Sequence, residues 1–252
     1  MLPSFRHPID LSAQYGHLET LKFFHDSESE KIQKLWIHAV DPMYYAAKGG
    51  QLAVVEWIHA NRSEKCGADA MDIAAGYGHL EVVKWLHSNR TEGCTSSAIT
   101  SAAARGYLDV ELMQWFHANY PDLYKHSRAM YEAARYGQLK VIKWLYENIP
   151  KIPAYEAIDR AIRSDHIHVA YWLQSRFPNY VVGSSLEFYK PLVYVNTAHT
   201  FETLLYLHVH CTDVFTPLFL RNLREDLTRY HRQMIANWLD EHYPSGTEDY
   251  GH

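Results

Sequence analysis

Histidines are the residues of this chain that could bind a metal or act as general bases. The 252-residue sequence contains 17 of them and three cysteines. The closest pairs are His166-x-His168 and His208-x-His210, whereas structural zinc sites need converging ligands at spacings such as Cys-x2-Cys and His-x3-His. Five histidines instead recur at one position of a repeated pattern, as structural side chains do: His25, His59, His87, His117 and His208. We therefore predict no metal site.

Other motifs with catalytic or cofactor-binding chemistry are incomplete. Ser96 and Ser97 can be combined with histidines only on paper, because a catalytic triad is defined by geometry. The segment Gly76-Tyr77-Gly78 begins like a dinucleotide fingerprint, but the third glycine and the preceding strand are absent. No nucleophile, base and orienting residue recur together. The sequence predicts no catalytic residue, no cofactor and no enzymatic activity.

The dominant pattern is an internal repeat aligned on a glycine. This glycine slot is filled by Gly16, Gly50, Gly78, Gly106 and Gly137, and by Asp165 in a sixth copy. The intervals are 34, 28, 28, 31 and 28 residues. Small residues, mostly alanine, precede the slot by three and four positions, and an aromatic residue such as Trp57 or Trp85 follows seven positions after it. A period of roughly 20–50 residues indicates stacked helical or β units.

Two copies depart from the pattern. In the fourth, Trp115 is reached through two extra residues, which we place near Asp109 and Val110, before the second helix. A degenerate seventh copy is expected in Pro191-Leu192-Val193-Tyr194 and Phe201 to His208, with His199 in the glycine slot.

Each copy is expected to form two short helices. Alanines on the first helix let its neighbour approach closely, and the slot glycine ends that helix in a left-handed conformation. The tryptophans of the second helix are predicted to pack in the interior. Asn61, Asn89 and Asn119, near the end of the second helix, are expected in a similar left-handed turn. This helix-end role is favoured over glycosylation for the sequons that begin at the first two of them.

With these features the units resemble ankyrin repeats. The family pattern, Thr-Pro-Leu-His-x-Ala-Ala-x-x-Gly-His-Leu-Glu, is similar to residues 41–52 and 70–83. The 28-residue spacing is shorter than the usual period of about 33 residues, and this short type resembles repeats of oomycetes and large DNA viruses. A tetratricopeptide solenoid is disfavoured, because its period is about 34 residues. The resemblance implies an all-α, ankyrin-like solenoid of stacked helix-turn-helix repeats with shortened or absent β-hairpin loops.

We expect two regions, ankyrin-like repeats in residues 1–211 and a C-terminal helical cap in residues 212–252. A net charge of −5 argues against duplex nucleic acid as a partner. No signal peptide or membrane-spanning run is recognisable, so we expect the protein in the cytoplasm or nucleus. We also expect a monomer.

Cys66 and Cys94 occupy one repeat position 28 residues apart. Stacked helices lie about 10 Å apart, and a disulfide needs Cα atoms within about 7 Å. Free thiols are therefore expected.

In ankyrin repeats, resemblance implies that partners bind the concave surface made by the first helices and the turns. Tyrosine and arginine, which concentrate binding energy at interfaces, are frequent there. The predicted partner-binding residues are Tyr15, Tyr44, Tyr45, Lys48, Asp72, Tyr77, Arg105, Tyr131, Glu132, Arg135, Tyr136, Arg160 and Arg163. The leading hypothesis is a non-catalytic scaffold or adaptor for a partner protein. The alternative is the recognition arm of a larger complex, such as a ligase adaptor or host-targeting effector, whose C-terminal segment recruits a second partner.

Overall fold

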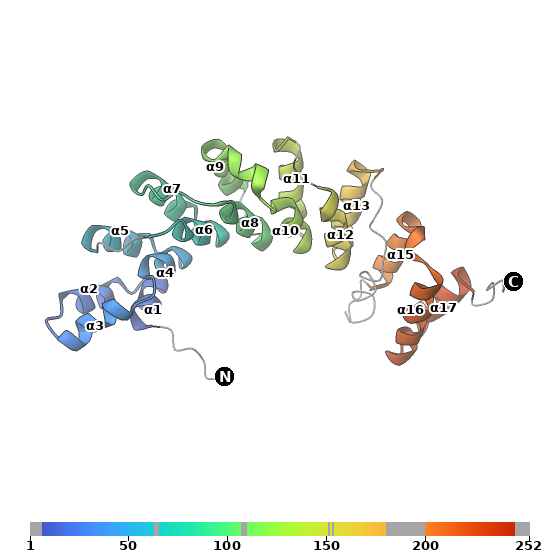
Figure 1. Cartoon of the computed structure of the whole chain (residues 1–252), viewed down its shortest axis with the longest axis horizontal. Coiled ribbons are helices and arrows are strands. Elements are labelled where there is room, and N and C mark those ends of the chain that lie inside the picture. Colours follow the sequence, from blue (N-terminus) through green and yellow to red (C-terminus); the bar gives the residue numbers. More distant parts are fainter. Residues whose placement is uncertain are drawn as a thin grey trace. The chain divides into compact units, whose positions relative to one another are not determined.

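The computed structural model describes residues 7–62, 66–106, 110–150, 152, 154–179 and 200–244, and every regular element in these ranges is a helix (Figure 1). It divides into two compact units. The first contains Met1–Ala133 and Lys140–Ile152, and the second contains Ala134–Leu139 and Pro153–His252. The described residues contain no strand, and short loops such as residues 90–95 join successive helix pairs. The prediction of an all-α solenoid without β-hairpin fingers is confirmed.

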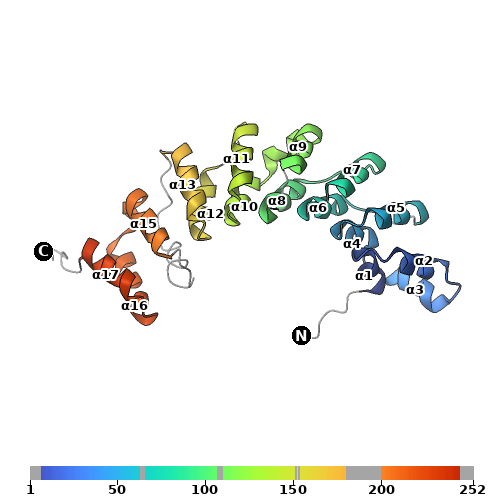
Figure 2. The same ribbon diagram turned by 180° about the vertical axis from the view of Figure 1, so that it is seen from behind.

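The first unit is a row of helix pairs. Its elements are α1 (Pro8–Gln14), α2 (Leu18–Asp26), α3 (Glu30–His38), α4 (Pro42–Lys48), α5 (Leu52–Asn61), α6 (Asp69–Gly76), α7 (Leu80–Asn89), α8 (Ser96–Arg105), α9 (Val110–Asn119), the 3₁₀ helix η1 (Pro121–His126), most of α10 (Ala129–Arg135) and most of α11 (Leu139–Asn148). The first helices pack side by side, α1 on α4, α4 on α6 and α6 on α8, and the second helix α5 packs on α7 (Figures 1 and 2). The first-helix face, defined as the first helices and the turns that follow them, is thus separate from the second helices.

The second unit contains further helix pairs. Its elements are α12 (Tyr155–Arg163), α13 (Ile167–Arg176), α15 (Thr200–His210), the 3₁₀ helix η2 (Thr212–Val214), α16 (Pro217–Arg229) and α17 (Gln233–His242). Helix α12 packs on α13, α13 on α15, and α16 on α17. Residues Pro191–Tyr194 and His199, the first half of the predicted seventh copy, lie outside the described residues. Its second half corresponds to α15.

The glycine slot adopts the left-handed turn that the sequence predicts. Gly50 has a φ of 69°, and Asp165, which replaces glycine in the sixth copy, has a φ of 63°. After Gly16, Gly50, Gly78 and Asp165 the amide N–H of the next residue donates to the carbonyl five residues back, as Gln51 does to Ala46 at 3.0 Å. This hydrogen bond satisfies a carbonyl that the end of the first helix would otherwise leave without a partner.

The same turn recurs in the C-terminal segment. His231 has a φ of 55°, and the N–H of Arg232 donates to the carbonyl of Leu227 at 2.9 Å. Trp238 follows His231 by seven residues, as the aromatic residue does in the other copies. Helices α16 and α17 therefore form a helix pair of the repeat type. The assignment of residues 212–252 as a separate cap stays a prediction.

The cores of both units follow the repeat positions. Ala74 and Ala75 on α6, and Ala102 and Ala103 on α8, are fully buried where the two helices pack. Residues with larger side chains fill the space between the rows, for example Phe116 on α9, which is also fully buried. Because the small residues allow close approach of the first helices, each pair buries its surface against its neighbours.

The longer intervals contain elements that the repeat pattern does not predict. The 34-residue interval contains α3, and the 31-residue interval contains η1. Trp36 of α3 is 6% exposed and lies 6.2 Å from the ring of Trp57. Helix α9 begins at Val110, four residues after Gly106, whereas α7 begins at Leu80, two residues after its own slot glycine. The extra pair was predicted near Asp109 and Val110: Asp109 lies outside the described residues, and Val110 is the first residue of α9.

The prediction for the recurrent asparagines is wrong in its geometry. Asn61, Asn89 and Asn119 are the last residues of α5, α7 and α9, and the described non-glycine residues with positive φ are Asp165 and His231. Each asparagine donates its Nδ2–H to the carbonyl of the tryptophan four residues earlier, at 2.8–2.9 Å. Each asparagine side chain therefore folds back onto the last turn of its own helix and bonds a carbonyl there.

Candidate binding surface

The predicted binding residues lie on first helices or on the turns that directly follow them. In the first unit these are Tyr15, Tyr44, Tyr45, Lys48, Asp72, Tyr77, Arg105, Tyr131 and Glu132. In the second unit they are Arg135 and Tyr136, around the turn after α10, and Arg160 and Arg163 on α12. The structure therefore divides the predicted row between two units.

Three members of the row form a cluster across three successive helix pairs of the first unit. The guanidinium carbon of Arg105 lies 4.0 Å from the ring centroid of Tyr77, and the Nζ of Lys48 lies 5.5 Å from the same centroid. His79 stacks on Tyr77, with centroids 6.3 Å apart and an interplanar angle of 9°. The face of an aromatic ring attracts cations, so Tyr77 holds the two positive groups close together.

Tyrosines of α4 extend this cluster. The rings of Tyr44 and Tyr45 contact each other edge to face, with centroids 5.3 Å apart. Arg105 and, more weakly, Lys48 lower the pKa of the Tyr77 hydroxyl, because a hydrogen bond and positive charge favour its ionised form. Burial raises the pKa of Tyr44, and the neighbouring hydroxyls of Tyr45 and Tyr77 add to this. The aromatic–cation cluster, defined as Tyr44, Tyr45, Lys48, Tyr77 and Arg105, is thus a positively charged part of the first-helix face.

The structure gives Asp72 a structural role. Its side chain is buried, and its carboxylate accepts hydrogen bonds from the N–H of Thr95 at 2.8 Å and from the hydroxyl of Thr95 at 2.5 Å. Asp10 occupies the same repeat position as Asp72, six residues before the glycine slot. Its carboxylate accepts a hydrogen bond from the N–H of Val40 at 3.1 Å. The two aspartates thus connect α1 and α6 to the segments that lead into the next helix pairs. We therefore remove Asp72 from the predicted binding surface.

Ionisation of Asp72 is expected to make stability depend on pH. Burial raises the pKa of its carboxyl above the ordinary 3.8, against the opposing effect of the hydrogen bonds from Thr95. Because the folded protein then binds the proton more tightly than the unfolded chain, the stabilisation is full below pH 3.8 and is lost as pH rises through the folded-state pKa. Urea unfolding of the wild type and of Asp72→Asn over a pH series measures this. Wild-type stability should fall relative to the variant as pH rises, and a difference that is constant with pH would contradict the assignment.

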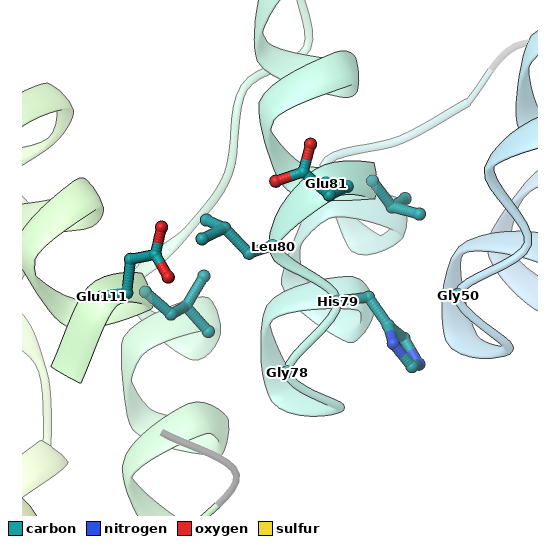
Figure 3. A pocket seen from close by; sticks show the side chains of 8 residues that line it. Gly50, Gly78, His79, Leu80, Glu81 and Glu111 are labelled. Atoms are coloured by element: carbon teal, nitrogen blue, oxygen red, sulfur yellow. The ribbon is translucent and has the colours of Figure 1, made fainter. Parts of the chain in front are cut away.

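Residues that follow the glycine slot rest on the preceding turn. His79 lies against Gly50, and its Nε2 is 3.1 Å from the carbonyl oxygen of Lys48 (Figure 3). In the second unit, His166 lies against Gly137 in the same way. These histidines therefore have a structural role, and among the described residues no three His, Cys, Asp or Glu side chains are grouped to hold a metal ion.

Histidines that end the second helices contact the tryptophan of the next helix pair. His59 meets Trp85 edge to face with centroids 5.2 Å apart, and His87 meets Trp115 in the same way at 5.2 Å. The corresponding pairs are His25 with Trp57, His117 with Trp144, and His208 with Trp238. The predicted structural role of these histidines is confirmed. Interior packing of the tryptophans is only partly correct, because Trp57, Trp85, Trp115, Trp172 and Trp238 are half-buried while Trp36 and Trp144 are buried.

An open hollow of about 340 Å³ lies between α7 and α9 in the first unit (Figure 3). Its lining includes Leu80, Leu112, Glu81 and Glu111. Glu81 already forms an ion pair with Lys84 at 2.9 Å. None of the predicted binding residues lines this hollow.

The cysteines do not have the properties of nucleophiles. Cys66, Cys94 and Cys211 are free thiols, and burial raises the pKa of each to about 12. A thiol with so high a pKa contains little of the reactive thiolate near neutral pH.

The second unit contributes a smaller set of predicted residues. Tyr136 is 49% exposed, and the guanidinium of Arg135 lies 5.2 Å from its ring centroid. Arg160 and Arg163 are half-buried. Arg135 and Tyr136 are therefore the more accessible residues here.

The helix pairs of this chain share one left-handed turn and one alanine packing position, and they present one exposed face. These are the features of an α-helical repeat protein. Comparison with known proteins agrees. The sequence profile described as ankyrin repeats (many copies) matches residues 43–87 and 71–117. The crystal structure of the human ASB11 ankyrin repeat domain has the same type of fold, with a TM-score of 0.52 over 79% of this chain and 97% of that chain, at 17% sequence identity. No curated protein matches by sequence.

Residues 43–117 are therefore ankyrin repeats, and the chain has the fold of an ankyrin repeat domain. Ankyrin repeats are in general protein–protein interaction modules without catalysis, which is the general function that the match supports. Among the helices that the structure describes, none is long and apolar enough to cross a bilayer. The relation to oomycete or viral repeats stays a prediction.

Proposed function

We propose that this protein is a non-catalytic scaffold or adaptor that binds a partner protein on the first-helix face of its first unit. The observation that carries the proposal is the aromatic–cation cluster, which brings tyrosines and two cations from α4, α6 and α8 onto one accessible surface. Tyrosine and arginine are enriched among residues that dominate binding energy. Tyr15, which is 61% exposed, adds another aromatic side chain at the turn after α1.

The second helices are less suited to this role. Their tryptophans and histidines are engaged with one another in edge-to-face contacts between neighbouring pairs. Their exposed ends carry asparagine caps that are bonded to the backbone. A partner on this face would compete with the contacts that hold the stack together.

Site-specific photo-crosslinking tests which face binds. The photoreactive residue p-benzoyl-phenylalanine would replace Tyr15 or Tyr131 on the first-helix face, and in a control Tyr146, which is 40% exposed on α11. After irradiation in the native cell, the first two variants are expected to yield a common crosslinked protein that mass spectrometry identifies. Equal crosslinking of that protein from Tyr146, or crosslinking from Tyr146 alone, would contradict the assignment.

Recruitment of a second partner by residues 212–252 has less support. The Nδ1 of His208 on α15 lies 2.8 Å from the hydroxyl of Tyr243, and the ring of Tyr243 stacks on Phe215 at 4.5 Å. The segment is thus engaged in packing against α15, a role expected of the last helix pair of a stack.

A further inference from the structure

We propose that the aromatic–cation cluster binds a carboxylate side chain, so that the partner docks through an acidic extended segment. This inference rests on the proposed function and names the partner chemistry of the same surface. The expected ligand is an aspartate or glutamate side chain on a short peptide stretch, held between Lys48 and Arg105.

Charge is the first argument. The structure places Lys48 and Arg105 against the ring of Tyr77, and neither has an ion-pair partner among the described residues. Lys22 and Lys84 of the same unit, in contrast, form ion pairs with Glu19 and Glu81. Two cations lie near one ring without an ion pair, in a chain whose net charge is −5, and Asp69 is an acidic group that acts on the neighbouring Tyr44.

Donor geometry is the second argument. Arg105 and Lys48 lie over the ring of Tyr77 and lower the pKa of its hydroxyl. The guanidinium offers several N–H donors in one plane, which suits the two oxygens of a carboxylate.

Rigidity is the third argument. Arg105 is exposed, but its guanidinium rests on the ring of Tyr77, which in turn stacks on His79. His79 is fixed against the turn at Gly50 by its contact with the Lys48 carbonyl. A cation that is already positioned loses less conformational freedom on binding, which favours affinity.

The proposal is tested with the full chain and immobilised twelve-residue peptide pools of four compositions: Asp/Glu-containing, phosphoserine-containing, Lys-containing and uncharged. Wild-type protein is expected to favour the Asp/Glu pool over the uncharged pool by about tenfold, the effect of one charge-assisted contact. Sodium chloride at about 0.5 M should reduce this preference, because exposed charges are screened.

Variants assign the preference to the cluster. Arg105→Ala and Lys48→Ala should each lose most of it, and the double charge reversal Lys48→Glu with Arg105→Glu should favour the Lys pool instead. The matched control is Arg128→Ala, which removes an equal charge from another Arg–Tyr contact, 4.3 Å over Tyr131, and should keep the preference. Circular dichroism confirms that each variant is folded.

Three outcomes would overturn the proposal. These are a wild-type protein without preference for the acidic pool, an acidic preference that survives in both alanine variants, and a stronger preference for the phosphoserine pool, which would assign the cluster to phosphate. Each of them leaves the proposed function intact if Tyr15 and Tyr131 still crosslink to a partner. Loss of those crosslinks, in contrast, removes the proposed function itself.

Discussion

Replacing Gly50 by alanine is expected to lower the free energy of unfolding by about 2–4 kcal/mol. Gly50 has a φ of 69°, a conformation that costs an L-residue about 1–2 kcal/mol. An added Cβ would also lie 2.5 Å from Nδ1 and 2.9 Å from Cγ of the His79 ring. The whole ring must therefore move, and its contact with the Lys48 carbonyl is lost. Urea unfolding followed by circular dichroism measures the change.

Gly93 provides the matched control for this prediction. It has a φ of 68°, but an added Cβ would have no atom within 4 Å. Gly93→Ala should therefore show the backbone cost alone, about 1–2 kcal/mol. In a His79→Ala background the cost of Gly50→Ala should fall to the same value. Equal losses for the two glycines in the wild-type background would show that His79 does not constrain the turn.

Replacing Trp36 by alanine is expected to cost about 3–5 kcal/mol. Trp36 is 6% exposed and joins α3 to the stack through the rings of Trp57 at 6.2 Å and His25 at 6.4 Å. The guanidinium of Arg62, the residue that follows α5, lies 4.4 Å from the centroid of the Trp36 ring. The measurement is the same urea titration, with tryptophan fluorescence as a second signal.

Trp36→Phe separates ring packing from the polar atom. The Nε1–H of Trp36 is buried without a hydrogen-bond partner in the described part of the chain. An unpaired buried donor carries a desolvation penalty. Removing the donor should therefore offset part of the packing energy that the smaller phenylalanine ring loses, and the net change in the free energy of unfolding should stay within about 1 kcal/mol. A loss below about 1 kcal/mol for Trp36→Ala would mean that α3 packs only loosely on its neighbours.

The fold was predictable because its determinants are local and repeated. The glycine slot marks a turn that needs positive φ, and the alanine pairs mark where first helices approach each other. Both signals recur at nearly constant spacing, so independent copies support one another. The same logic predicts the extra pair of the fourth copy ahead of the apolar block of α9, because the spacing within that block is unchanged.

What could not be predicted depends on contacts between residues far apart in the chain. Helix α3 occupies an interval without a counterpart in the other copies, and its amphipathic residues are too few to identify it alone. The roles of Asp72 and Thr95 became visible only when the two were brought together across 23 residues. The recurrence of aspartate at positions 10 and 72 was an available signal. Grouping of Lys48, Tyr77 and Arg105 followed from their places one or two residues before the glycine slot, but the lack of an ion pair for either cation among the described residues did not.

The glycine turn and its covering side chain make the junction between helix pairs self-contained. The junctions after Gly16 and Gly50 each use one backbone bond within the turn and one side chain laid on it from the next pair, Gln51 on Gly16 and His79 on Gly50. Cys66 and Cys94 mark equivalent points one period apart. A gene that gained or lost that period would keep every junction in register. Chain length, and with it the number of surface residues offered to a partner, can therefore vary in evolution by whole units without a new kind of contact.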